Sequence, residues 1–438
     1  MLGREYDNAL VEVANRCSSD LQSQVALNGS IEDGISALTD RALTYVRRSG
    51  RFDDLDADGQ REAATAVVND LFQLGPIEEL LWDQSITEIM VNSPDQIMIE
   101  RAGKIEQAPV HFRDEDHVAA IIQRVVGSDN RRCDFQSPLC DCMLHRAGTP
   151  FDGSRVNAVA MGIAKHWTLN IRKFRNDMLT PEALIENGSM NERVAEIFQA
   201  LIRARMNILI EGSTGTGKTT LLNMMSNYIP DNQRIITVED TAELNLAKSH
   251  VVSLQARPEN NEGRGKITLQ QLVINTLRER PDRIIVGECR GAEVFDMLQA
   301  MSSGHDGSLT TVHANNPRNS LDRLMLLMQT NPSASHMPPA SIMSVITEAV
   351  DFIIEVKRLP DGTRRVNDIS EVCGSQGSVA TLGSIMHFKK TGIDEKTGRI
   401  EGVFAATGSR IVSEDHKERF YANDVEIKNE WFDNGGTW

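Results

Sequence analysis

The residues with the clearest chemistry form a glycine-rich run near the middle of the chain. The run fits the phosphate-loop pattern G-x-x-x-x-G-K-[ST] at every required position: Gly212-Ser213-Thr214-Gly215-Thr216-Gly217-Lys218-Thr219-Thr220. Glycines let the backbone approach closely, so several N–H groups can point at one anion. We expect Lys218 to reach the terminal phosphates and the Thr219 hydroxyl to bind Mg²⁺. The run therefore predicts a site for a nucleotide and its Mg²⁺ ion.

The segments on both sides of the run have the pattern that a phosphate loop requires. Ile208-Leu209-Ile210 predicts a buried strand before the loop, and the apolar residues from Leu221 to Met225 predict a helix after it. The N-terminus of that helix would add partial positive charge where the phosphates bind. A strand, a glycine turn and a helix in this order indicate a nucleotide site and not a chance match.

Acidic residues follow two of the other strands that we predict, at 234–238 and 284–287. The carboxyl ends of parallel strands meet at the edge of the sheet where a phosphate loop also lies. We therefore expect Glu288 to activate the attacking water and to contribute to the Mg²⁺ shell. Glu239 is interpreted as a ligand of the metal or the water. Asp240 is a weaker candidate, because Asp240 or Thr241 can instead cap a helix.

One histidine is predicted to lie at the same edge of the sheet. His313 ends the strand predicted at 309–312. We interpret His313 as a sensor of the γ-phosphate or as a hydrogen-bond partner of the acids, and this role does not require it to carry a proton.

The pattern along the chain predicts four parts. Residues 1–74 have apolar residues at helical spacing and predict a helical segment, with breaks near Asn28-Gly29-Ser30 and at 56–59. Residues 75–180 mix strands and a helix and predict a separate α+β domain. Residues 181–350 alternate strands with helices, which predicts an α/β domain with a mostly parallel sheet covered on both faces. Residues 351–438 begin with a hairpin signal at Asp361-Gly362 and end in a charged tail whose pattern predicts no particular structure.

Composition limits the classes of function. The net charge of −16 argues against a nucleic-acid motor, whose channel needs a basic lining. No apolar run approaches the ~18 residues that span a bilayer, and charged residues near the N-terminus argue against a signal peptide. We therefore expect a cytoplasmic protein with reduced thiols. Cys133, Cys140 and Cys142 raise the question of a zinc site, but Cys-x-Cys spacing is atypical of structural zinc, and incidental thiols are the favoured interpretation.

With these motifs in hand, the chain resembles the type II/type IV secretion ATPase superfamily, and within it the branch that powers assembly of Flp/Tad pili. Four boxes carry the resemblance in order: the phosphate loop, the acidic box 236–244, the run 277–293 that ends in Glu288 and its neighbours, and the histidine box 304–315. Two matches in the N-terminal domain, 87–92 and 152–157, extend the resemblance over residues 75 to 410.

The resemblance implies a RecA-like P-loop ATPase domain behind a PAS-like domain. It implies ATP and Mg²⁺ as ligands, a homohexameric ring, and inner-membrane platform proteins as partners, with the protein peripheral at the cytoplasmic face of that membrane. Arginines of the N-terminal domain reach the phosphates in this superfamily, and Arg155 and Arg172 occupy the matching positions. A salt bridge within a strand is the alternative role for each.

Three other functions stay open from the sequence. The same fold could serve a conjugation-type (type IV) secretion channel. A nucleotide-gated scaffold that binds ATP without useful hydrolysis is less compatible with the acids Glu288 and Glu239. A nucleic-acid motor would require a local basic channel in spite of the acidic total.

Overall fold

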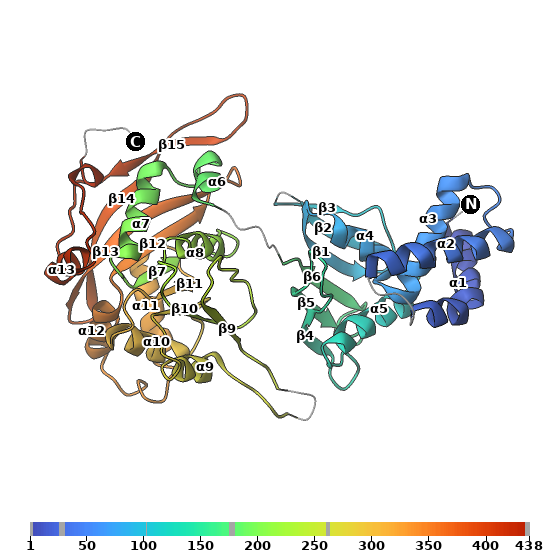
Figure 1. Ribbon diagram of the computed structural model, residues 1–438, viewed down its shortest axis with the longest axis horizontal. Coiled ribbons are helices and arrows are strands. Elements are labelled where there is room, and N and C mark those ends of the chain that lie inside the picture. Colours follow the sequence, from blue (N-terminus) through green and yellow to red (C-terminus); the bar gives the residue numbers. More distant parts are fainter. Residues whose placement is uncertain (1–2, 26–30, 102, 175–179, 260–262, 434–438) are drawn as a thin grey trace. The chain divides into compact units, whose positions relative to one another are not determined.

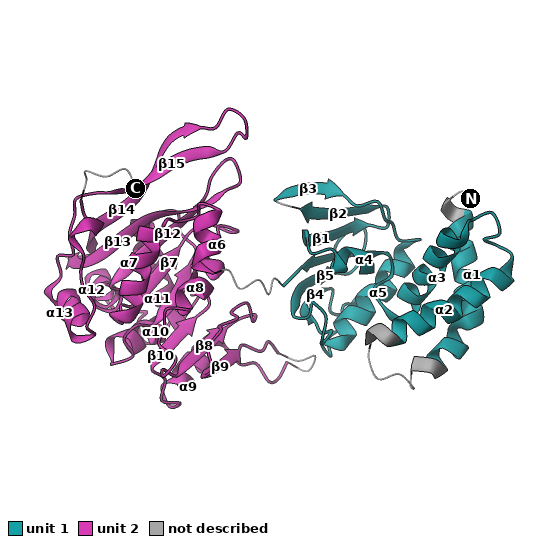
Figure 2. Cartoon of the chain, turned by 45° about the horizontal axis from the view of Figure 1, so that its top comes forward, with its two compact units in different colours: residues 1–175 teal, residues 176–438 magenta. Residues whose placement is uncertain are grey.

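The computed structural model describes residues 3–25, 31–101, 103–174, 180–259 and 263–433. The chain divides into two compact units, residues 1–175 and 176–438 (Figure 2). The predicted segment 1–74 and nearly all of 75–180 lie in the first unit, and both later segments lie in the second. The predicted break at Asn28-Gly29-Ser30 lies outside the described residues. No helix of the described part of the chain is long and apolar enough to cross a membrane.

The first unit begins with helices, as the spacing of apolar residues predicts. They are α1 (Gly3–Val25), α2 (Ile31–Ser49) and α3 (Ala57–Phe72). Their buried residues, such as Val13, Leu21 and Val46, form one apolar cluster. The break predicted at 56–59 is the N-terminus of α3, where the Asp56 side chain accepts the N–H of Gly59 at 2.9 Å.

A sheet forms the rest of the first unit. Its elements are η1 (Gly75–Ile77), α4 (Glu78–Trp82), β1 (Ile86–Ser93), β2 (Gln96–Arg101), β3 (Lys104–Gln107), α5 (Glu115–Ser128), β4 (Leu139–Leu144), β5 (Ser154–Val159) and β6 (Thr168–Arg172). The strands pair antiparallel in the order β3-β2-β1-β6-β5-β4. Alternating burial along β5 and β6 places apolar side chains on one face and polar ones on the other.

The second unit alternates strands with helices over most of its length. Its elements are α6 (Pro181–Glu186), α7 (Glu192–Arg203), β7 (Ile208–Glu211), α8 (Lys218–Ser226), β8 (Ile235–Glu239), β9 (Val251–Gln255), α9 (Leu269–Thr276), β10 (Arg283–Val286), α10 (Glu293–Ser302), β11 (Leu309–Val312), α11 (Pro317–Met328), α12 (Pro339–Ala349), β12 (Phe352–Arg358), β13 (Arg364–Gln376), β14 (Val379–Ile393), β15 (Ile400–Ala406), α13 (Glu414–Ala422) and η2 (Asn429–Trp431).

The strands of the second unit form one sheet in the order β15-β14-β13-β12-β7-β11-β10-β8-β9 (Figure 1). From β12 to β9 neighbouring strands are parallel, and β13, β14 and β15 join antiparallel. Successive residues of β7 enter different cores: Ile208 and Ile210 pack with α7 and α8, whereas Leu209 packs with α10 and α11 on the other face. This explains the uninterrupted apolar strands and confirms the predicted mixed α/β fold with a mostly parallel sheet.

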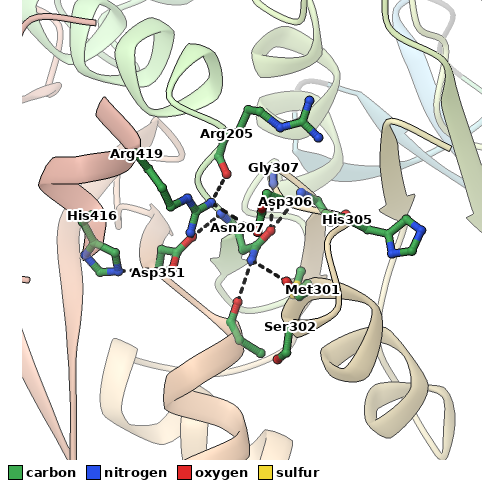
Figure 3. A network of polar contacts seen from close by, with 12 residues as sticks. Arg205, Asn207, Met301, Ser302, His305, Asp306, Gly307, Asp351, His416 and Arg419 are labelled. Atoms are coloured by element: carbon green, nitrogen blue, oxygen red, sulfur yellow. Dashed lines mark hydrogen bonds and ion pairs between the residues drawn. The ribbon is translucent and has the colours of Figure 1, made fainter. Parts of the chain in front are cut away.

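The C-terminal tail, for which the sequence predicts no particular structure, packs into the core of the second unit. Phe420 of α13, Trp431 and Phe432 are buried in the same cluster as β7 and α7. Figure 3 shows the polar contacts that accompany this packing. Asp351, just before β12, accepts the backbone N–H of Asn207 at 2.7 Å and Arg419 Nη1 at 2.6 Å.

A histidine of α13 joins the same network (Figure 3). His416 Nε2 lies 3.2 Å from Asp351 Oδ1, and Nδ1 lies 2.8 Å from Glu371 Oε1. Burial alone lowers the pKa of His416, but the hydrogen bonds with the two carboxylates outweigh it and raise that pKa to about 9. The helix α13 is therefore held at neutral pH by a charged, buried imidazolium.

Candidate nucleotide site

The phosphate loop lies between a fully buried strand and a helix, as the sequence predicts. Strand β7 ends at Glu211, and α8 begins at Lys218. A Cβ atom on Gly212 would lie 2.4 Å from the Val356 carbonyl oxygen and 2.7 Å from Thr216 Oγ1. Only glycine fits at this position, because β12 runs directly beside the first residue of the loop.

Lys218 folds back on its own loop. Its Nζ donates to the carbonyl oxygens of Gly212 at 2.9 Å and Ser213 at 3.1 Å, and it lies 3.4 Å from His313 Nδ1. The side chain is buried, and burial is the main reason that the pKa of Lys218 is lowered. The carbonyl oxygens carry only partial negative charge. A bound anion in the loop would therefore be a stronger partner for the Lys218 ammonium group.

The structure brings Glu288 and His313 together beside Lys218, as expected for residues at the ends of β10 and β11. Glu288 Oε1 lies 2.8 Å from His313 Nε2. Glu288 Oε2 accepts two hydrogen bonds from Arg290, at 2.9 Å from Nε and 2.6 Å from Nη2. A continuous chain of contacts therefore runs from the lysine through the imidazole to the carboxylate.

The protonation of His313 follows from these neighbours. The pKa of His313 is lowered, first by burial and then by the positive charge of Lys218. A neutral imidazole matches the geometry, because Nδ1 can accept from the lysine while Nε2 lies 2.8 Å from Glu288 Oε1. His313 therefore lies beside the carboxylate, and its predicted role as a sensor of the γ-phosphate or as a hydrogen-bond partner of the acids stays a prediction.

Glu239 contacts the backbone in this structure. Its Oε1 accepts the N–H groups of Glu243 and Leu244, both at 2.8 Å, and its side chain is buried. Glu243 in turn accepts a hydrogen bond from the Thr219 hydroxyl at 3.2 Å. The predicted role of Glu239 as a ligand of metal or water stays a prediction. In the geometry described here Glu239 shapes the segment that carries Glu243.

Glu243 is a functional candidate to which sequence reasoning assigned no role. The only signal was its spacing from Glu239 in the acidic box. The alternative role that the sequence leaves open for Asp240 or Thr241, a helix cap, is wrong. No helix forms in the described segment 240–250, where the Glu239 carboxylate instead accepts the N–H groups of Glu243 and Leu244. The Asp240 carboxylate lies 3.6 Å from Arg290 Nη1 instead.

The two arginines proposed as phosphate ligands lie side by side in the first unit. Arg155 of β5 is directly opposite Arg172 of β6, and Arg172 is opposite Glu88 of β1. Residues directly opposite in an antiparallel pair project from the same face, with Cβ atoms about 5 Å apart. Two adjacent guanidinium groups favour an anion between them. Their contact with a nucleotide stays a prediction.

The cysteines do not form a metal centre in the described residues. Cys140 and Cys142 project from the same buried face of β4, and Cys133 is also buried. No group of three or more His, Cys, Asp or Glu side chains in the described ranges is arranged to hold a metal ion.

The site fits a nucleotide-bound Mg²⁺ ion by the chemistry of its oxygen atoms. Thr219 Oγ1, the Glu243 carboxylate and the Glu288 carboxylate are hard oxygen ligands of the type that Mg²⁺ prefers. Glu288 Oε1 is buried and accepts no well-directed hydrogen bond, although His313 Nε2 is close to it. Such an oxygen atom is suited to a cation or a water that arrives with the nucleotide.

Another buried carboxyl group belongs to the residue that immediately precedes the phosphate loop. Glu211 is completely buried, and neither of its carboxyl oxygens has a hydrogen-bond partner within the described structure. It is paired in register with Glu355 on the neighbouring strand β12. Burial, and secondly the charge of Glu355, raise the pKa of Glu211 to about 8.

Glu211 should therefore make folding stability depend on pH. Its pKa in the unfolded chain is close to the ordinary value of 4.5, below the folded value of about 8. The folded state binds the proton more tightly, so the free energy of unfolding falls as pH rises from about 4.5 to about 8. Glu211→Gln removes this titration. We expect the variant to match the wild type near pH 5 and to exceed its stability by roughly 2–4 kcal/mol above pH 8.

Denaturant unfolding of both proteins between pH 5 and pH 8.5 measures this difference. Glu348→Gln, on the exposed surface of α12, is the matched control and should leave the pH profile of stability unchanged. Parallel profiles for the wild type and Glu211→Gln would contradict the assignment of a protonated Glu211.

A family model matches the part of the chain that holds the first sheet, the phosphate loop and the parallel strands of the second sheet. A family model described as type II/IV secretion system protein matches residues 70–363. A putative conjugal transfer protein of Mycobacterium tuberculosis is 35% identical over 309 residues, which cover 70% of this chain and 87% of that protein. The type IV secretion system protein VirB11 of Brucella suis is 29% identical over 370 residues, covering 78% of this chain and 99% of VirB11.

A solved structure shares the fold. The pilus retraction motor PilT with bound ADP superposes with a TM-score of 0.50 at 20% identity, covering 70% of this chain and 80% of that chain. At this identity the similarity concerns the architecture alone.

Proposed function

Because the chain belongs to the type II/IV secretion system protein family, we propose that it is an ATP-hydrolysing motor of a pilus-assembly or secretion machine. The observation that carries the proposal is the convergence of Lys218, His313 and Glu288 beside the phosphate loop. Binding alone needs the loop and the lysine. Hydrolysis also needs a carboxylate that can position water, and Glu288 is linked to Lys218 through His313.

Each residue of the site has a distinct proposed role. Loop N–H groups bind the phosphates, and Lys218 exchanges the carbonyl oxygens of Gly212 and Ser213 for phosphate oxygens. Glu288, held by His313 and Arg290, orients the attacking water and accepts its proton. Mg²⁺ bound with ATP would neutralise negative charge on the phosphates, and Thr219, Glu243 and Glu288 are placed to hold it, with Glu239 as the support of Glu243.

The proposed assembly rests on the resemblance to the secretion ATPase superfamily. We propose a homohexamer in which Arg155 and Arg172 act as arginine fingers at the nucleotide of the same or a neighbouring subunit. The ring would act on platform proteins at the cytoplasmic face of the inner membrane, as a peripheral protein that does not bind nucleic acid. Sizing of the protein in solution with Mg²⁺ and ATP tests the ring directly.

Two kinds of machine are supported for the motor. The resemblance of the four boxes favours Flp/Tad pilus assembly, whereas a relative named as a conjugal transfer protein and the similarity to VirB11 favour a conjugation-type channel. Deletion of the gene separates them, because loss of surface pili indicates the first, and loss of conjugal DNA transfer with pili retained indicates the second. Complementation with an inactive variant shows whether turnover is required.

Replacement of Lys218 tests the enzymatic part of the proposal. We expect steady-state phosphate release from ATP in the presence of Mg²⁺, and a loss of at least about 100-fold in Lys218→Ala, since the lysine supplies the positive charge at the terminal phosphates. ADP binding by both proteins is measured in parallel. A wild type that binds ADP without releasing phosphate, alone or with membranes, would favour the non-hydrolysing scaffold.

A further inference from the structure

An arginine from a distant segment contacts the tip of the phosphate loop. Arg364, the first residue of β13, donates from Nε to the carbonyl oxygen of Gly215 at 2.9 Å. A Cβ atom on Gly217 would lie 3.3 Å from Arg364 Cδ, so the side chain also packs along the second half of the loop. The residue lies just beyond the stretch 70–363 that the family model matches.

The hairpin that carries Arg364 is rigid and lies on the side of the loop away from the acids. Strand β12 pairs with β7 on one side, while β11 and β10, which lead to His313 and Glu288, lie on the other. Asp361 closes the turn: its Oδ1 accepts from Thr363 N and Oγ1 at 3.0 and 2.7 Å. Its Oδ2 accepts the N–H of Ile400 at 2.6 Å, which ties the turn to β15. Arg364 is thus presented to the loop from a fixed support.

The contact controls the direction of one peptide group. In a trans peptide the carbonyl and the following N–H point in opposite directions. While Arg364 holds the carbonyl of Gly215, the N–H of Thr216 is therefore directed away from Arg364. Glycine gives this peptide unusual freedom to rotate, and a rotated peptide would present a carbonyl oxygen to the phosphates in place of a donor.

We propose that Arg364 is a positioning residue that keeps the Gly215–Thr216 peptide in its phosphate-binding orientation and thereby sets the affinity for nucleotide diphosphates and triphosphates. The proposal rests on the proposed function, because it requires that the loop bind a nucleotide. It concerns the phosphates that the loop cradles and not the nucleoside.

Direct binding measurements with ADP and AMP test it, using the full-length wild type, Arg364→Ala and Arg364→Gln. We expect Arg364→Ala to weaken ADP binding about tenfold, since it removes a charge-assisted hydrogen bond to the loop. AMP lacks the β-phosphate and offers the loop only its α-phosphate, so its affinity should change less than about twofold. Arg364→Gln keeps an amide donor without the charge and should recover part of the loss.

The control is Arg358→Ala, because Arg358 is directly opposite Arg364 in the β12–β13 pair, is exposed and carries the same charge. We expect it to bind ADP as the wild type does. Equal losses in the two alanine variants, or equal losses for ADP and AMP, would overturn the proposal in favour of a general electrostatic or nucleoside contact. Unchanged ADP affinity in Arg364→Ala would refute the positioning role of Arg364 and leave the proposed function standing. A wild type that does not bind ADP would refute both.

Discussion

Glu288→Gln is expected to reduce the turnover number for ATP about a thousandfold while leaving nucleotide affinity within about threefold of the wild type. The amide has nearly the same shape as the carboxylate, and one oxygen can still accept from Arg290 as Glu288 Oε2 does. It cannot accept a proton from water, and it lacks the negative charge that orients the His313 imidazole through the 2.8 Å contact. Lys218 and the loop, which provide most of the binding, are unchanged.

Phosphate-release kinetics and ADP or ATP binding, measured on the same preparation, separate the two effects. Asp240→Asn is the matched control, because Asp240 follows the neighbouring strand β8 and also faces Arg290, at 3.6 Å. It should keep its turnover within about threefold, since an exposed pair at this distance contributes little. Loss of a general base typically slows a reaction by about 100-fold or more. If Glu288→Gln retained more than about a tenth of the wild-type turnover, Glu288 would not be the general base.

Gly307→Ala is expected to destabilise the second unit by more than about 4 kcal/mol, which is at the upper end for a single substitution. Gly307 has a φ of +82°, and an added Cβ would lie 1.7 Å from Arg283 Nη1. Arg283 cannot move aside easily. It is completely buried and donates to the carbonyl oxygens of Gly307 at 3.0 Å and Ile202 at 2.9 Å, and to Gln233 Oε1 at 2.7 Å.

Gly304→Ala, in the same loop before β11, is the natural control. Gly304 has a similar φ of +95°, but an added Cβ would meet no atom within 4 Å. It should therefore cost only the backbone strain of about 1–2 kcal/mol. Denaturant unfolding measures both variants. Similar losses in the two would mean that strain alone, and not the clash with Arg283, makes glycine necessary at 307.

Much of the catalytic edge could be predicted from local sequence. The phosphate loop is a contiguous pattern, His313 directly follows the buried strand β11, and Glu288 lies two residues after the buried strand β10. The carboxyl ends of parallel strands must share an edge, so their proximity follows once the strands are recognised. The mixed α/β class follows from the same alternation of strands and helices.

The C-terminal tail shows where the local pattern fails. Residues after 412 are charged with scattered aromatics, yet Phe420 and Trp431 are buried and His416 is an imidazolium between Asp351 and Glu371. Its partners lie 45 to 65 residues earlier in the chain. A periodicity argument examines only one segment at a time, so it cannot identify a short helix whose stability comes from such distant contacts.

The sequence by itself therefore determined the chemistry of this protein: a loop that binds phosphates, acids and a histidine at strand ends, and the sheet that aligns them. Only the tertiary structure decided which distant side chains contact the residues of the proposed site. Arg364 meets Gly215, Glu355 lies beside Glu211, and Glu239 turns Glu243 toward Thr219. The physical reason is that sheet order and loop conformation set these contacts, and both depend on pairings between segments that no local spacing encodes.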